Sequence, residues 1–189
     1  MAAFGAKYIK YAAIKTEEEN KLPAYDAQKT KMIGSLVKAD LTVNFASGEL
    51  YADDLLAEKA EEFISGNIAV EVDELDDEVA SVIYGATVNE ENEKVDNTGD
   101  NAPYGGLGYI KTLMKKGTKY YRAYYYPKVR AALGNDNTAT KSSSITFSTT
   151  PVNFTVYEPK TGDWRYTKKF NTEAEAKAWI DSKLSSAGV

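Results

Sequence analysis

Residues 105–133 read GGLGYIKTLMKKGTKYYRAYYYPKVRAAL, and this stretch decides the fold. Residues 115–118, Lys-Lys-Gly-Thr, interrupt it with a glycine, which readily adopts the backbone of a tight turn. After this turn, the even positions of residues 119–130 hold only tyrosines and bases, whereas Ala123 and Val129 fall at odd positions. Alternation with a period of two is typical of a strand. We therefore predict a β-hairpin here and a fold built mainly from strands.

Four other segments alternate in the same way. They are residues 35–46, 64–73, 152–156 and 164–170. Each places apolar side chains at every second position, which favours strands with one buried face. The turn sequence Pro-Lys-Thr-Gly at 159–162 predicts that the last two strands form a second hairpin.

Two segments have helical spacing instead. Residues 74–84 open with acids, which suit a helix N-terminus, and carry apolar residues three and four apart. Residues 171–185 open with Thr172 and Glu175, the pattern of a capping box. We expect a mainly β (α+β) fold, with a C-terminal helix and a second short helix packed on the sheet.

The chain of 189 residues predicts one domain, residues 1–189. Polar stretches at 16–30, 48–62 and 90–101 are expected to be extended loops, because they lack a sustained apolar period. Loops of this length are often functional, and we interpret these three as assembly loops.

The composition argues against most enzyme classes. Histidine and cysteine are both absent, so the commonest general base, thiolate nucleophiles and the commonest metal ligands are missing. A hydrolase that uses carboxylates alone stays an alternative, although no isolated pair of acids in an apolar context suggests one. The sequence predicts no enzyme, no cofactor and no metal site. No apolar run is long enough for a signal peptide or a membrane span, so no membrane insertion is expected.

Charge is divided unevenly along the chain. Residues 105–133 hold seven bases, six tyrosines and no acid, whereas residues 49–96 hold sixteen acids against Lys59 and Lys94. Such a division can guide subunits of one protein toward one another. Bases interleaved with aromatic residues can instead bind single-stranded nucleic acid, so a nucleic-acid-binding module is the alternative. A pI near 5.0 argues against that alternative.

Two smaller motifs have competing interpretations. The glycines Gly105, Gly106 and Gly108 resemble part of a phosphate-binding loop, but strand-like residues follow them instead of a helix. A flexible start of a strand or a close backbone approach explains them as well. The acids of residues 73–78 lack calcium-loop spacing, so helix capping or an acidic surface competes with cation binding.

A resemblance to a known family is carried by an ordered series of short segments spread over nearly the whole chain. They are FGAKY at 4–8, IGSLVKADLTV at 33–43, GELYADD at 48–54, DDEVA at 76–80, YGA at 84–86, PYGGLGY at 103–109 and YYYPKV at 124–129. In this order they resemble the major tail proteins, or tail tube proteins, of long non-contractile-tailed, siphovirus-type phages of Gram-positive hosts.

The resemblance implies a two-sheet β-sandwich or barrel that assembles into stacked, hexameric rings. It implies a virion protein that is assembled in the host cytoplasm and forms a tube through which double-stranded DNA passes. The implied partners are further copies of the chain and the tape-measure, tail-terminator and distal tail proteins. The tube of a contractile injection apparatus is a closely related alternative function.

Candidate site residues follow from the charge pattern and the resemblance together. The expected subunit interface contains Lys115, Lys116, Lys119, Arg122, Tyr124, Tyr126, Tyr51, Asp53 and Asp54. The expected acidic lumen or interface contains Glu71, Asp73, Asp76 and Asp77. An acidic lumen would repel the phosphates of DNA, whereas a basic one would bind them and impede ejection.

Overall fold

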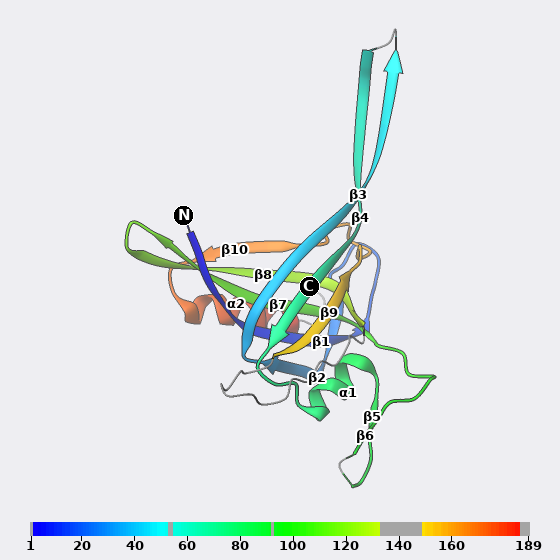
Figure 1. Ribbon diagram of the computed structural model, residues 1–189, viewed down its shortest axis with the longest axis vertical. Helices are drawn as coiled ribbons and strands as arrows, with labels where there is room; N and C mark the ends of the chain where they lie inside the picture. The colour runs from blue at the N-terminus through cyan, green and yellow to red at the C-terminus, as the bar shows by residue number, and fades with distance from the viewer. Residues whose placement is uncertain (1, 53–54, 92, 133–148, 186–189) are drawn as a thin grey trace, which may run out of the picture.

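The computed structural model describes residues 2–52, 55–91, 93–132 and 149–185 (Figure 1). It is mainly β, with ten strands and two helices among the described residues, which confirms the expected fold class. In chain order the elements are β1 (Ala2–Thr16), β2 (Ala24–Gly34), β3 (Leu36–Ala52), β4 (Leu55–Val72), α1 (Asp77–Tyr84), β5 (Thr87–Val88), β6 (Lys94–Val95), β7 (Tyr104–Lys115), β8 (Thr118–Ala132), β9 (Thr150–Val156), β10 (Tyr166–Phe170) and α2 (Glu173–Ser185).

One large antiparallel sheet contains most of the strands, in the order β2-β1-β7-β8-β9-β4-β3. The sheet curls, so that β1 also contacts β3 across the inside. Its inner face buries Ile9 and Tyr11 of β1 with Ile68 of β4 and Phe154 of β9. The two layers of the expected sandwich are thus parts of one curled sheet, which encloses one core cluster and carries a second cluster on its outer face under α2.

The basic hairpin is confirmed. Strands β7 and β8 pair from Tyr104 to Lys115, and Lys115 lies opposite Thr118. Between them, Lys116 and Gly117 have φ angles of 48° and 80°. Positive φ at both central residues is the geometry that two-residue hairpin turns need, because its twist matches that of the flanking strands.

The prediction of a second hairpin at residues 152–170 is wrong. Gly162 donates to the carbonyl of Pro159 at 2.9 Å, so the turn exists, but β9 and β10 do not pair with each other. Both pair with β8 instead. Strand β9 pairs with the last four residues of β8, Val129–Ala132, and β10 pairs with residues Tyr121–Tyr125 of β8. A strand as long as β8 has room along one edge for two short partners.

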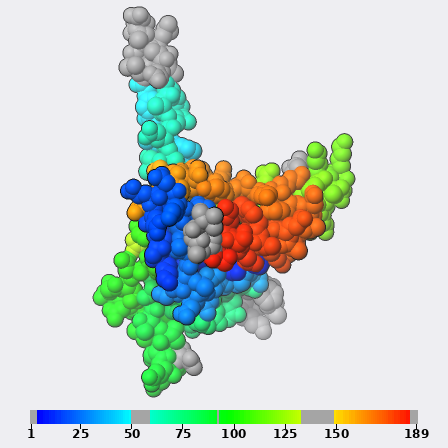
Figure 2. All heavy atoms as spheres, turned by 180° about the vertical axis from the view of Figure 1, so that it is seen from behind, coloured from blue at the N-terminus to red at the C-terminus, as the bar shows by residue number. Residues whose placement is uncertain are grey.

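Helix α2 covers the outer face of the sheet, on the side shown in Figure 2. Its residues Ala176 and Ile180 pack on Ile110 and Tyr125. The predicted capping box is present, since Thr172 and Glu175 each accept the other's backbone N–H at 3.3 Å.

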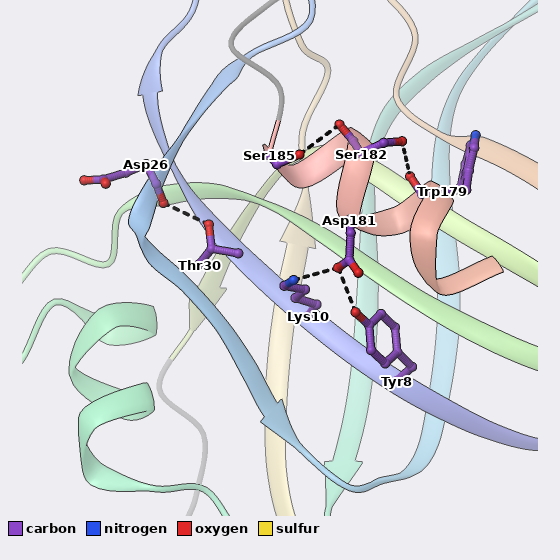
Figure 3. A network of polar contacts seen from close by, with 8 residues as sticks. All are labelled: Tyr8, Lys10, Asp26, Thr30, Trp179, Asp181, Ser182 and Ser185. Carbon is purple, nitrogen blue, oxygen red and sulfur yellow. Dashed lines mark hydrogen bonds and ion pairs between the residues drawn. The ribbon is translucent and has the colours of Figure 1, made fainter. Parts of the chain in front are cut away.

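Polar contacts also hold α2 to β1. Asp181 accepts hydrogen bonds from the Tyr8 hydroxyl at 2.7 Å and from Lys10 Nζ at 2.6 Å (Figure 3). Lys7 pairs with Glu173 at 2.5 Å. Acids of α2 are therefore neutralised within the chain.

The three glycines of β7 allow close packing. A side chain at Gly105 would collide with the ring of Tyr11, and one at Gly106 would meet Tyr25 Oη at 2.6 Å. At Gly108 it would meet Ile180 of α2 at 2.5 Å. Close approach by neighbouring side chains therefore explains the motif, as one of the two interpretations expected.

The other expected boundaries need correction. Helix α1 starts later than residue 74, because Asp76 caps it by accepting from the N–H of Glu78 at 2.8 Å. The expected loop at 16–30 includes the first seven residues of β2, Ala24–Thr30. The hydroxyl of Tyr25 donates to the carbonyl of Pro127 at 2.8 Å and lies 2.5 Å from that of Tyr125, which fixes this strand against the body. In the described part of residues 90–101, only β6 is regular.

Candidate functional site

An acidic arm projects from the body, and it consists of residues 45–52 of β3 and 55–64 of β4. The pairing continues from Phe45 opposite Phe63 outward to Ala52 opposite Leu55. Eight strand residues span roughly 25 Å, and Figure 1 shows this pair of strands rising away from the curled sheet. The prediction of a loop at 48–62 is therefore wrong, because the segment forms most of a long β-hairpin.

The described side chains of the arm are exposed, apart from Phe63 at its base. All side chains of residues 45–49 and 59–62 are exposed, among them Phe45 at 55%, and Ile64 beside them is 58% exposed. In sequence, residues 45–64 carry six acids and only Lys59, which itself pairs with Glu61 at 2.6 Å. An isolated two-stranded hairpin is marginal in water, so this arm is suited to gaining stability from a partner.

A stack of aromatic rings anchors the base of the arm. The Phe63 ring lies parallel to the ring of Trp164, with centroids 4.5 Å apart and planes inclined by 6°. The guanidinium of Arg165 lies 4.7 Å from the Trp164 centroid. These contacts fix the point at which the hairpin leaves the body.

The basic surface lies on the β7–β8 hairpin and β10, and it consists of Lys111, Lys115, Lys116, Lys119, Arg122 and Lys169. Lys115, Lys116 and Lys119 are exposed at the hairpin end. None of these three forms a salt bridge with any residue in the part of the chain that the structure describes. The hairpin end therefore presents positive charge that the described chain leaves uncompensated.

Three bases of this surface form a row across the sheet. Lys111 lies opposite Arg122, which in turn lies opposite Lys169, so all three point to the same face. Like charges in directly opposite positions are destabilising. Lys169 Nζ lies 3.5 Å from the ring centroid of Tyr120, and this cation–π contact offsets part of the repulsion.

Tyr124 and Tyr126, two of the three tyrosines expected at the interface, pack within the body. Tyr126 is fully buried, and its hydroxyl oxygen lies 3.3 Å from that of Tyr109. Tyr124 is half-buried, with its ring stacked on Tyr109 at 5.1 Å. Tyr126 thus belongs to the core, so its assignment to a surface is wrong. Arg122 is half-buried and belongs to the row of bases.

Replacing Tyr126 by alanine should lower the free energy of unfolding by about 3–5 kcal/mol, the usual cost of truncating a buried aromatic residue. Tyr126→Phe, which removes only the hydroxyl, should cost about 1 kcal/mol. Urea unfolding followed by circular dichroism measures both. Unchanged stability in the alanine variant would contradict the core position of Tyr126.

Tyr51, Asp53 and Asp54 are the remaining interface candidates. Tyr51 is in β3, opposite Leu56, where the structure describes the backbone pairing and not the side chain. Asp53 and Asp54 lie outside the described residues.

The acids expected at a lumen are gathered near the start of α1. Asp73 accepts from the N–H groups of Ser35 at 2.7 Å and Glu74 at 2.8 Å, and these bonds lower the pKa of its carboxyl. Asp76 caps the helix. Asp73 and Asp76 therefore serve the local backbone, which agrees with the capping interpretation.

The remaining two acids differ from these. Glu71 lies in β4 opposite Lys38 and accepts a hydrogen bond from Thr149 Oγ1 at 3.3 Å. Asp77 is exposed in the first turn of α1. Among the described residues, no group of three or more acids is placed to hold a metal ion.

Comparisons with known proteins identify no relative: no family model matches the chain, and a search of curated proteins finds no match. None of the helices in the described ranges has the length and apolar character that crossing a bilayer requires.

Proposed function

We propose that this chain is a structural virion protein that assembles with copies of itself into the tail tube of a siphovirus-type phage. In this proposal, stacked sixfold rings surround a channel through which double-stranded DNA reaches the host. The role is structural and needs neither catalysis nor a cofactor. The chain would be assembled in the host cytoplasm and would contact tape-measure, tail-terminator and distal tail proteins in the tail.

The acidic arm is the observation that carries this proposal. Its described side chains other than Phe63 are exposed, and among them Phe45 and Ile64 are apolar. The outer edges of its two strands pair with no other described strand, so backbone groups are also available to a neighbour. A subunit made for assembly has a use for such an arm, whereas a monomer gains little from it.

Further support comes from the mainly β body and from the ordered segments between residues 4 and 129 that resemble tail tube proteins. A tube needs a rigid body to form its wall and extended elements that reach neighbouring subunits. The curled sheet supplies the first, and the arm and the β7–β8 hairpin supply the second.

Antibody labelling tests the proposed role in the particle. An antibody raised against the purified chain should bind along the tail shaft of phage particles released by the bacterium that carries the gene. Gold label counted by electron microscopy is the measurement, and a shaft without label beside labelled control proteins would contradict the proposal.

A nucleic-acid-binding role is the second candidate. The row of Lys111, Arg122 and Lys169, with Tyr120 beside it, has the charge and aromatic character of a single-strand-binding face. Binding of oligonucleotides by the monomer, with a steep dependence on salt, would favour this role. The main proposal expects weak binding at most.

A further inference from the structure

We propose that the acidic arm of one copy docks on the basic surface of a second copy. This inference rests on the proposed self-assembly and adds to it the two surfaces that meet. The contact joins two different patches, so each subunit offers one patch to each of two neighbours. Contacts of this kind form closed rings or open stacks and do not stop at a dimer.

The two surfaces do not neutralise each other within one chain. Figures 1 and 2 show the arm and the β7–β8 hairpin leaving the body in different directions. Elsewhere the chain does pair its charges: Lys10 bonds Asp181 at 2.6 Å, and Lys128 bonds Glu17 at 2.8 Å. The hairpin end, where no such pairing is described, is therefore the surface that a partner would neutralise.

The charges of the two surfaces are complementary in sign. The described strands of the arm carry four acids, Glu49, Glu58, Glu61 and Glu62, and one lysine, and the basic surface carries six bases. Residues 105–133 contain no acid. Single exposed ion pairs contribute little, but a field of this size speeds encounter and selects the orientation of docking.

Exposed apolar residues accompany both surfaces. Phe45 and Ile64 lie at the base of the arm, and Phe4 and Met114 lie beside the basic surface with exposures of 43% and 37%. Met114 is opposite Ala2 of β1, so Phe4 is its near neighbour in the sheet. Apolar residues amid charge are typical of contacts between proteins, and they favour a second copy over a nucleic acid as the occupant.

Complementary charge reversal tests the docking. The hairpin variant carries Lys115→Glu, Lys116→Glu and Lys119→Glu, and the arm variant carries Glu49→Lys, Glu61→Lys and Glu62→Lys. All six side chains are exposed, so the fold should persist, and circular dichroism of each monomer checks this. The assembled fraction of each variant alone should fall about tenfold or more, the equivalent of about 1.4 kcal/mol, because like charges then meet.

Mixing the two variants gives the deciding result. In an equimolar mixture each acidic surface again finds a basic one, so the variants should assemble together in alternation and restore sedimentable polymer. A control with Lys15→Glu, Lys38→Glu and Lys160→Glu, three exposed bases outside the hairpin and outside the three expected assembly loops, should assemble like the wild type.

The outcomes separate this inference from the proposed function. Wild-type assembly that survives either reversal, a mixture that stays monomeric, or a control that fails as badly as the hairpin variant would overturn the docking and leave the tube role standing. Loss of oligonucleotide binding by the hairpin variant, with assembly unchanged, would assign the basic surface to nucleic acid. A wild type that neither assembles nor labels tail shafts would contradict the proposed function as well.

Discussion

A chain without its arm is expected to fold and to remain a monomer. Replacing residues 46–62 by Asn-Gly joins Phe45 to Phe63, which already lie opposite each other, through the shortest favourable hairpin turn. The removed residues 46–49 and 59–62 are exposed and add nothing to the core, so the melting temperature should change by only a few degrees.

Assembly should respond far more strongly to the same change. Deleting the arm removes its exposed acids and its unpaired strand edges together. The protein concentration needed for assembly should therefore rise by about a hundredfold or more. Sedimentation over a concentration series measures this. A second variant replaces residues 90–93 by Asn-Gly between Asn89 and Lys94 and shows whether this other expected assembly loop also contributes. If the armless chain polymerises as readily as the wild type, the arm is not the assembly element.

Alkaline solution is expected to unfold the protein abruptly. Burial raises the pKa values of five tyrosines above their ordinary value near 10, namely Tyr11, Tyr25, Tyr109, Tyr125 and Tyr126. Burial and the hydrogen bond to Asp163 raise the pKa of Tyr166 to about 12. Above about pH 10 the folded chain therefore retains the hydroxyl protons of these tyrosines, whereas the unfolded chain loses them.

The sign of the pH dependence follows from this difference. Below pH 10 both states hold the protons, so the contribution of the tyrosines to stability is fully present. Above pH 10 the unfolded state releases them, and each tyrosine removes about 1.4 kcal/mol of stability per pH unit. Five together remove about 7 kcal/mol per unit, which is comparable with the whole stability of a domain.

Absorbance at 295 nm and circular dichroism test this together. The buried tyrosines should ionise in the same narrow range in which the strand signal disappears, between about pH 10.5 and 12. Ionisation of all fourteen tyrosines near pH 10 with the strand signal intact would contradict their burial.

Sequence patterns predicted the elements whose signals are local. The turn at Lys116 and Gly117 and the capping box of Thr172 and Glu175 appear where expected, because both depend on residues within one or two turns of chain. The arm was missed for the opposite reason. Its described side chains other than Phe63 are exposed, the sequence of residues 48–62 shows no apolar alternation, and the described parts of the two strands are joined by cross-strand pairing.

The pairing of strands that are distant in the chain could not be predicted from the sequence either. The turn at Gly162 looked like a hairpin turn, but β9 and β10 both find their partner in β8. Tyr126 and Lys128 alternate with the same period, yet one is buried and the other half-buried, because only part of the face is covered. A period identifies the two faces of a strand, but the packing of distant elements decides where each face is covered.

Of the candidate site, the exposed bases were predictable and the acids only in part. Lys115, Lys116 and Lys119 flank a turn, and turns lie at surfaces. Asp73 and Asp76 also lie at the surface, but both are committed to backbone N–H groups that no charge count reveals. The strongest acidic candidate is now the arm, whose Glu61 and Glu62 are exposed.

Electron microscopy of the purified wild-type chain tests self-assembly most directly. The protein would be concentrated and imaged at low and at moderate salt, with the armless chain beside it. Our account predicts hollow rings or tubes from the wild type and single particles of monomer size from the armless chain. Wild-type protein that stays monomeric at every concentration and salt, even when tail fragments are added as nuclei, would contradict it.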